Sequence, residues 1–284
     1  MIDQAQVDLV AEMLSNSQQP LVVFPPTTDP DLFAASYSLF AFLSLSRDCR
    51  LLTPSFDQAP QQALSDYYHP DKVETEMGKE NLVISFPYQE TQVDKVSYHI
   101  GEDGQRFYLT IKPQRGVTPL DSQKVDFSYA GTTSDCIFLC GVEQLEDLKQ
   151  LYFAYEQLYQ PKNTQLVSVA SPVPDLGQAR FALDEGGAHS QLVFELIKAL
   201  AQTSNVDLGE FCTLSRASTL LLYGIEHKSR GLQDPTTSPG TFKVVAELLE
   251  LGAERLFSVT PPARKKPARP SLGKNGRPAE VQLK

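Results

Sequence analysis

The stretch Leu21–Ser46, LVVFPPTTDPDLFAASYSLFAFLSLS, runs from a short apolar segment through a loop of Pro, Thr and Asp into a long apolar segment. Leu21–Phe24 is typical of a fully buried strand, and Phe33–Leu45 is apolar nearly all round, which indicates a helix buried against a sheet. In α/β folds, ligand sites lie at the carboxyl ends of the strands, where a loop leads into the next helix. This stretch therefore predicts a parallel α/β fold, with Asp29 and Asp31 where such a fold holds its functional site.

Strands and helices continue to alternate through the rest of the chain. Short apolar runs predict strands, and apolar stripes at intervals of three and four residues predict helices. This alternation favours an α/β fold with a mainly parallel sheet flanked by helices, in a single domain over residues 1–260. The expected strands are Arg50–Leu52, Cys136–Cys140 and Leu166–Ala170, and the expected helices are Asp3–Ser15, Val142–Tyr159, Ser190–Gln202, Leu208–Tyr223 and Phe242–Leu251.

The period of the apolar residues changes within residues 81–113. Two runs alternate apolar and polar residues, a period of two that is typical of antiparallel strands. The glycines and the aspartate of residues 101–104 supply the conformations that a tight turn needs. We therefore expect a β-hairpin insertion here that adds an edge or a flap to the parallel sheet, with His99 at an exposed, outward position. The apolar residues of the two runs are Val96, Tyr98 and Ile100, then Phe107, Leu109 and Ile111.

Length and composition exclude several classes of protein. With 284 residues, 41% of them hydrophobic, the chain can bury a substantial core. No apolar run is long enough to span a membrane, and the N-terminal residues MIDQAQVDLVAEML do not resemble a signal peptide. We therefore expect a cytoplasmic protein without membrane contact. The four cysteines have neither the spacing of a metal site nor the density of a disulfide scaffold, so we expect buried free thiols.

Charge is distributed unevenly along the chain. The formal net charge is −10, but residues 261–284 carry seven Lys or Arg and one Glu, so residues 1–260 carry −16. An acidic body is not typical of a general nucleic-acid binder, because phosphate contacts need clustered cations. The basic, Pro-rich segment 261–284 has too few apolar residues to fold, and we expect it to be a disordered tail.

This tail is where we expect contact with a polyanion or an acidic partner. The candidates are RNA, a nucleotide or an acidic protein, and the alternative is a solubilising tail or one folded back on the acidic body. The cations expected to make such a contact are Arg264, Lys265, Lys266, Arg269, Lys274 and Arg277.

Three segments together resemble the DHH family of phosphoesterases. Asp29-x-Asp31 with the following Leu32–Ser36 is similar to the first motif of the family, and Gly186–Leu200 is similar to the helix after its central loop. Leu220–Ala253 shares a Gly-Ile turn and a Thr/Ser-Pro-x-Thr-Phe helix start. The resemblance implies the parallel α/β domain of that family, a pair of manganese ions held partly by the two aspartates, and activity of the oligoribonuclease or nucleoside bisphosphate phosphatase type.

The chain departs from this family at most of the positions that would hold metal. Two divalent ions held close together need several carboxylates, so two aspartates alone cannot hold them. The resemblance also implies a second, substrate-binding domain, which we do not expect in this chain. The departures are Pro25 in place of a histidine, Gly141-Val142 in place of a second aspartate site, Ala170-Ser171-Pro172 in place of the Asp-His-His motif, Lys228 in place of a further aspartate, and Ser229 in place of a threonine.

We therefore interpret the chain as a degenerate, non-catalytic phosphoesterase of this type that binds a nucleotide, a short RNA or a protein partner, with no cofactor. An active phosphodiesterase or phosphatase with Mn²⁺, acting on short oligonucleotides or nucleoside phosphates, is the alternative. A purely structural interaction module is a third hypothesis. Asp29 and Asp31 are candidates for vestigial metal ligands, and the alternative for Asp29 is an N-cap of the helix that follows. The residues expected to line the cleft are Ser36, His189, Lys228 and Ser229.

Overall fold

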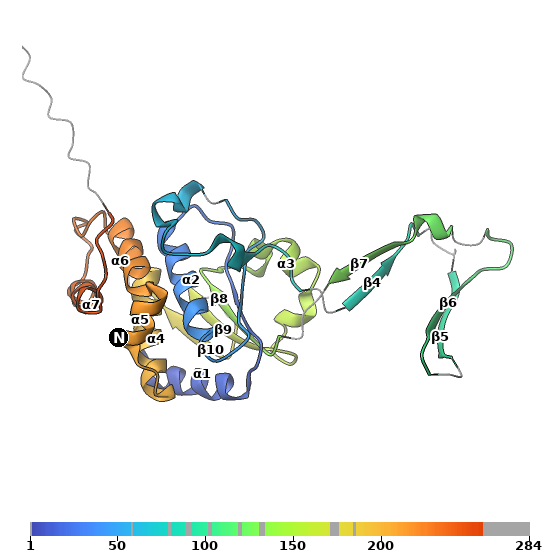
Figure 1. The fold of residues 1–284 in the computed structure, drawn as a ribbon, viewed down its shortest axis with the longest axis horizontal. Coiled ribbons are helices and arrows are strands. Elements are labelled where there is room, and N and C mark those ends of the chain that lie inside the picture. Colours follow the sequence, from blue (N-terminus) through green and yellow to red (C-terminus); the bar gives the residue numbers. More distant parts are fainter. Residues whose placement is uncertain are drawn as a thin grey trace, which may run out of the picture.

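The structure, a computed structural model, describes residues 2–57, 59–78, 81–88, 93–101, 104–118, 121–130, 134–170, 176–183 and 186–257. The tail expected to be disordered, residues 261–284, lies outside them. So do residues 171 and 172, which belong to the segment in place of the Asp-His-His motif. Figure 1 shows a body built on a sheet flanked by helices, and an arm of antiparallel ribbons that projects from the body.

The body is organised around a six-stranded sheet with the strand order β10-β9-β8-β1-β2-β3. All of its described pairings are parallel. β1 lies inside the sheet, with Leu21 opposite both Arg50 of β2 and Ile137 of β8. The predicted mainly parallel α/β fold is therefore confirmed. The strands are β1 (Pro20–Val23), β2 (Arg50–Leu52), β3 (Val73–Glu74), β8 (Cys136–Cys140), β9 (Gln165–Ala170) and β10 (Ala179–Ala182).

Helices of very different length flank this sheet. Among the described residues, none of the helices has both the length and the apolar character needed to cross a membrane. The α-helices are α1 (Gln4–Asn16), α2 (Pro30–Leu43), α3 (Gln150–Phe153), α4 (His189–Ser204), α5 (Leu208–Ser215), α6 (Ala217–Lys228) and α7 (Pro239–Glu250). Short 3-10 helices are η1 (Ala59–Leu64), η2 (Pro70–Lys72), η3 (Ser122–Lys124), η4 (Leu145–Leu148) and η5 (Glu156–Tyr159).

Two of the predicted helices are broken. The single helix expected over Val142–Tyr159 is replaced by η4, α3 and η5, and the one expected over Leu208–Tyr223 is divided into α5 and α6. A non-glycine residue with positive φ stands at each break, Lys149 at 47° and Arg216 at 55°. A positive φ cannot continue a right-handed helix, and an apolar stripe does not reveal it. The prediction of two continuous helices was therefore wrong.

Two apolar cores lie on opposite faces of the sheet. Successive side chains of a strand point to opposite faces, so Val22 packs in one core while Leu21 and Val23 pack in the other. The long helices α1, α2, α4 and α6 line the first core. The short helices line the second, to which Leu148 and Tyr159 contribute. Burial on both faces explains why the central strands are apolar throughout.

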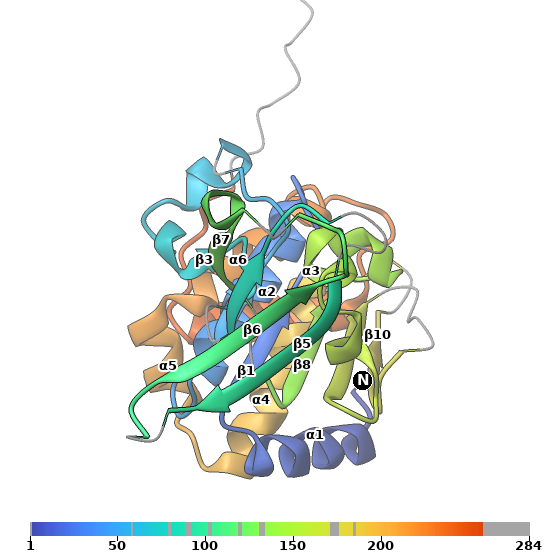
Figure 2. The same cartoon turned by 90° about the vertical axis from the view of Figure 1, so that its right-hand side faces the viewer.

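The arm consists of two antiparallel ribbons. β4 (Asn81–Ser85) pairs with β7 (Asp126–Ala130), and β5 (Val93–Ile100) pairs with β6 (Phe107–Pro113). The β4–β7 ribbon lies between the body and the β5–β6 hairpin, which stands in the foreground of Figure 2. The predicted hairpin is confirmed. Of its two expected placements, an edge strand of the parallel sheet was wrong, because both ribbons are separate two-stranded sheets. His99 is exposed, as predicted.

The four cysteines, Cys49, Cys136, Cys140 and Cys212, are all buried and free. Burial raises the pKa of the Cys136 and Cys140 thiols to about 12. The prediction of buried free thiols is confirmed, and at neutral pH these thiols are protonated and poor nucleophiles.

Candidate functional site

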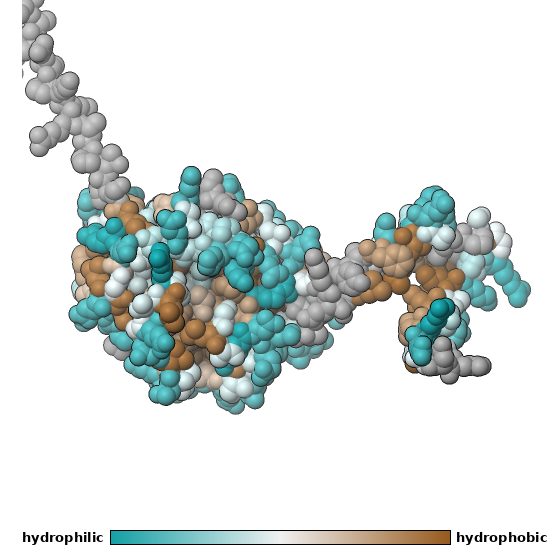
Figure 3. Space-filling view, in the orientation of Figure 1, coloured by the Kyte–Doolittle hydropathy of each residue, from teal (hydrophilic) through white to brown (hydrophobic). Residues whose placement is uncertain are grey.

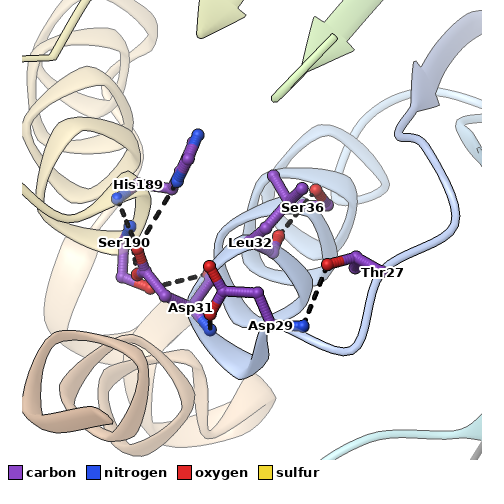
Figure 4. Close-up of polar contacts among 7 residues, drawn as sticks. All are labelled: Thr27, Asp29, Asp31, Leu32, Ser36, His189 and Ser190. Carbon is purple, nitrogen blue, oxygen red and sulfur yellow. Dashed lines mark hydrogen bonds and ion pairs between the residues drawn. The ribbon is translucent and has the colours of Figure 1, made fainter. Parts of the chain in front are cut away.

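The loop after β1 is organised by Asp29. Its backbone N–H donates to Thr27 Oγ1 at 2.9 Å, and its carboxylate accepts from the backbone N–H of Asp31 at 3.0 Å (Figure 4). Pro30 follows in the first turn of α2, where a missing N–H costs nothing. Asp29 is thus the N-cap of α2, and such a cap stabilises a helix by about 1 kcal/mol. The capping interpretation of Asp29 is confirmed.

Asp31 connects the first turn of α2 to the start of α4. It is fully buried, its Oδ2 accepts from the backbone N–H of His189 at 2.7 Å, and its Oδ1 accepts from that of Ser190 at 2.9 Å. The Ser190 hydroxyl donates in return to the backbone carbonyl of Asp31 at 3.2 Å. Ala188, the N-cap residue of α4, makes no side-chain cap. Asp31 therefore caps a helix that begins 158 residues further along the chain (Figure 4).

The carboxylate of Asp31 is held ionised inside the protein. Burial alone would raise its pKa, but hydrogen bonding and charge from His189, together with hydrogen bonds from Ser190, outweigh burial and bring the pKa below its usual value. The imidazole Nδ1 of His189 lies 3.5 Å from Oδ2 of Asp31. The positive end of the α4 dipole also favours a negative charge here. At neutral pH this junction contains a buried carboxylate with both oxygens in use.

A glycine of α6 closes the junction. A Cβ at Gly224 would lie 2.2 Å from Ser190 Oγ, which is closer than atoms can pack, and 3.0 Å from Asp31 Oδ1, which is a tight contact. The backbone of α6 therefore lies directly against the starts of α2 and α4. We call the contact of Asp31, His189, Ser190 and Gly224 the helix junction. It joins three helices through one carboxylate.

The carboxyl end of β8, where the resemblance implied an aspartate, is apolar. Gly141 has a φ of 62°, and a Cβ there would meet Cδ1 of Leu32 at 2.5 Å. Leu32 and Val142 are both buried. Ser36, expected in the cleft, is fully buried and donates to the backbone carbonyl of Leu32 at 2.8 Å. This region offers apolar packing and a satisfied hydroxyl instead of oxygen ligands.

The end of α6 contains the other two residues expected in the cleft. Lys228 is exposed. Hydrogen bonds from Thr236 lower the pKa of Asp234, and the charges of Arg230 and Lys228 add to this effect. Ser229 is buried, donates to the backbone carbonyl of Ile225 at 2.6 Å and accepts from a backbone N–H of the following turn at 3.1 Å. Of the residues expected in the cleft, the structure thus places His189 against Asp31. Ser229 instead stabilises the end of α6 through hydrogen bonds to nearby backbone groups.

The residues that come together do not fit a pair of manganese ions. Each oxygen of Asp31 already accepts from a backbone N–H, and the carboxylate is fully buried. Within the described ranges, no three His, Cys, Asp or Glu side chains are grouped where they could hold a metal ion. Manganese favours several oxygen ligands with free lone pairs. The donor set of the junction does not supply them.

Sequence reasoning missed two members of the helix junction, Ser190 and Gly224. The signal that could have indicated Ser190 is Ala188, because a helix preceded by alanine lacks its own cap and needs an acceptor from elsewhere. Gly224 gave a weaker signal. A glycine within an apolar helix costs about 1 kcal/mol relative to alanine, so it indicates a close backbone approach without saying to what.

Comparisons with known proteins support the fold. No protein-family model matches this sequence, and no curated protein matches it either. Among solved structures, the chain is similar to the crystal structure of an exopolyphosphatase-related protein from Bacteroides fragilis, with a TM-score of 0.57 and 12% identity. The match covers 89% of this chain and 58% of that protein, so this chain spans little more than half of its length. At this identity, the similarity shows a shared fold.

Proposed function

We propose that this chain is a phosphoesterase-like protein that does not hydrolyse phosphoesters and acts by binding a partner. The observation that carries this proposal is the use of Asp31, whose two carboxylate oxygens accept the N–H groups of His189 and Ser190 at the start of α4. A carboxylate that binds a catalytic metal needs lone pairs directed at the ion. In this chain the lone pairs of Asp31 accept hydrogen bonds from the first residues of α4, and these bonds connect α4 to α2.

Freeing Asp31 for a metal ion would be costly. The N–H groups of His189 and Ser190 would lose their acceptor inside the protein, and each buried donor left unsatisfied costs about 1–3 kcal/mol. Gly224 also packs directly against the carboxylate, so the backbone of α6 restricts the side chain on that side. Metal binding at Asp31 would therefore compete with the packing of the body.

Of the three classes of partner, the described part of the chain favours a protein. The carboxyl end of β8 offers the buried apolar side chains of Leu32 and Val142. Large exposed apolar side chains are concentrated on the arm instead, and they include Tyr98, Ile100 and Phe107. Aromatic and apolar side chains are typical of protein interfaces, whereas phosphates are bound by Arg and Lys.

Manganese binding and hydrolysis by the purified full-length chain test this proposal. We expect no hydrolysis of dinucleotides or nucleoside bisphosphates above background with manganese present, and no heat of manganese binding in calorimetry. Asp29→Ala is the informative variant, because losing an N-cap costs only about 1 kcal/mol and should leave the chain folded. Manganese-dependent turnover that Asp29→Ala abolishes, with an unchanged circular dichroism spectrum, would overturn the proposal.

A further inference from the structure

The β5–β6 hairpin has one apolar face and one polar face. Residues directly opposite each other in an antiparallel pair share a face. The polar face contains Lys95, Ser97, His99, Tyr108, Thr110 and Lys112. The apolar face contains three pairs, Val96 opposite Ile111, Tyr98 opposite Leu109, and Ile100 opposite Phe107. This apolar face contains no charged residue.

The apolar face is exposed. Tyr98 is 70% exposed, Phe107 65% and Ile100 63%. The rings of Tyr98 and Phe107 stack with their centroids 5.3 Å apart, so the two aromatic side chains pack against each other on this face. The β4–β7 ribbon adds two more exposed apolar side chains, Leu82 and Phe127. Figure 3 shows apolar surface, in brown, on both ribbons of the arm.

A two-stranded ribbon with such a face is not expected to stand alone in water. An isolated hairpin is marginally stable at best, and independent stability needs a third strand or a packed partner. The parallel sheet does not supply one, because β5 and β6 form a sheet of their own. The hairpin therefore needs a surface from outside the body to cover its apolar face.

We propose that a second copy of this chain provides that cover, with the apolar faces of two β5–β6 hairpins packed against each other. A two-fold axis near the central pair, Tyr98 and Leu109, would set each face against an identical one, as in an isologous dimer. Sheets stacked in this way lie about 10 Å apart with interdigitated side chains. The polar faces, with His99 and Thr110, stay in water. No residue of this interface belongs to the helix junction, so the inference is independent of the loss of hydrolysis.

The exposed area is suited to a dimer. The six residues of this face, five of them exposed and Ile111 half-buried, present on the order of 600 Å². That is at the upper end of the largest apolar patch of a typical monomer. The hairpin face alone thus supplies most of the roughly 800 Å² that each partner contributes to a standard interface.

Charge also favours a second copy. Residues 81–130 carry five Lys or Arg and six Asp or Glu, a net of −1, while the rest of residues 1–260 carries −15. Two bodies of this charge repel each other at close range, whereas two nearly neutral arms do not. Because the arm projects from the body, contact through the hairpins keeps the acidic bodies apart (Figure 1). An uncharged apolar face also offers a nucleic acid no phosphate contact.

Sedimentation velocity over a concentration series tests the dimer with neighbouring residues on opposite faces. We expect the full-length chain to reach twice its monomer mass of 31.5 kDa. Leu109→Lys places a charge in the centre of the apolar face and should raise the dissociation constant about 30-fold or more, the effect of an interface hot spot. Thr110→Lys adds the same charge to the polar face and should change it less than about 3-fold. A wild-type chain that stays monomeric at about 100 µM would overturn the proposal and would indicate a different partner protein.

Cysteine cross-linking distinguishes loss of the interface from unfolding of the hairpin. The four native cysteines are buried, so a new surface cysteine would be the reactive one under mild oxidation. Leu109→Cys should form a disulfide-linked dimer, seen on a non-reducing gel, and Thr110→Cys should form much less. Equal cross-linking from both positions would show that the apolar face does not form the contact.

Discussion

The strands of the body and the strands of the arm contain similar apolar residues but bury them to opposite extents. In β8 every side chain is buried, including Phe138, which is fully buried in the core that the long helices line. In the β5–β6 hairpin, Phe107 and Tyr98 face solvent. The difference lies in what packs behind each strand, helices in the body and nothing described in the arm. An apolar pattern therefore predicts a strand, and only the tertiary structure shows whether that strand belongs to a core or to an interface.

Matched phenylalanine substitutions give the largest expected difference between the two regions. Phe138→Ala leaves a cavity in the core and should lower the free energy of unfolding by about 3–5 kcal/mol. Phe107→Ala removes an exposed side chain and should change it by less than about 0.5 kcal/mol. Urea unfolding at sub-micromolar protein, where association contributes little, measures both values. Equal losses would mean that the arm is packed as a core element.

The helix junction provides an intermediate effect, because it is a polar contact inside the apolar body. Asp31→Asn replaces one buried acceptor by an NH₂ group facing an N–H, and we expect a loss of about 3 kcal/mol. Asp29→Asn is the control, since asparagine is an equally good N-cap and the change should cost only a few tenths of a kcal/mol. Thermal unfolding of the two variants makes the comparison.

Lowering the pH should weaken the contact that Asp31 makes in the wild-type protein. The pKa of Asp31 is lower in the folded protein than its ordinary value of 3.8, so its stabilising contribution is complete above that pH and is lost as the pH falls through the folded value. The difference in unfolding free energy between wild type and Asp31→Asn should therefore shrink below about pH 4. A difference that is independent of pH would contradict an ionised Asp31.

The smallest expected effect is on the polar face of the hairpin. The rings of His99 and Tyr108 stack with centroids 4.7 Å apart, and a cross-strand pair of this kind contributes about 0.2–1 kcal/mol. His99→Ala should speed hydrogen exchange of the hairpin amides by up to about fivefold and leave those of β1 and β8 unchanged. Faster exchange in the body would show that hairpin and body open together.

Much of the fold could be predicted from local patterns, and the failures have a common physical cause. β1 and α2 follow from the apolar residues around Asp29, and the hairpin follows from its period of two. The pairing of Asn81 with Ala130, which sets the arm apart from the sheet, joins residues far apart in sequence and leaves no local pattern. The short strands β3 and β10 also depend on their neighbours more than on their own residues.

The candidate site was predictable only where its chemistry is local. The cap made by Asp29 bonds to a residue two positions away, so residue type and position were sufficient. The role of Asp31 depends on His189 and Ser190, which only the folded chain brings near. The Asp-x-Asp spacing therefore placed both carboxylates at the start of α2 but left the partners of Asp31 unknown.

The contact between Leu32 and Gly141 determines the order in which a metal ligand could be introduced at the end of β8. An aspartate at position 141 would need both a positive φ and the space that the Leu32 side chain occupies. Leu32→Ala would make that space, and it leaves a cavity that costs about 2–5 kcal/mol before any ligand is present. A metal ligand introduced at position 141 would therefore need either a first substitution that lowers the free energy of unfolding by that amount or two simultaneous substitutions.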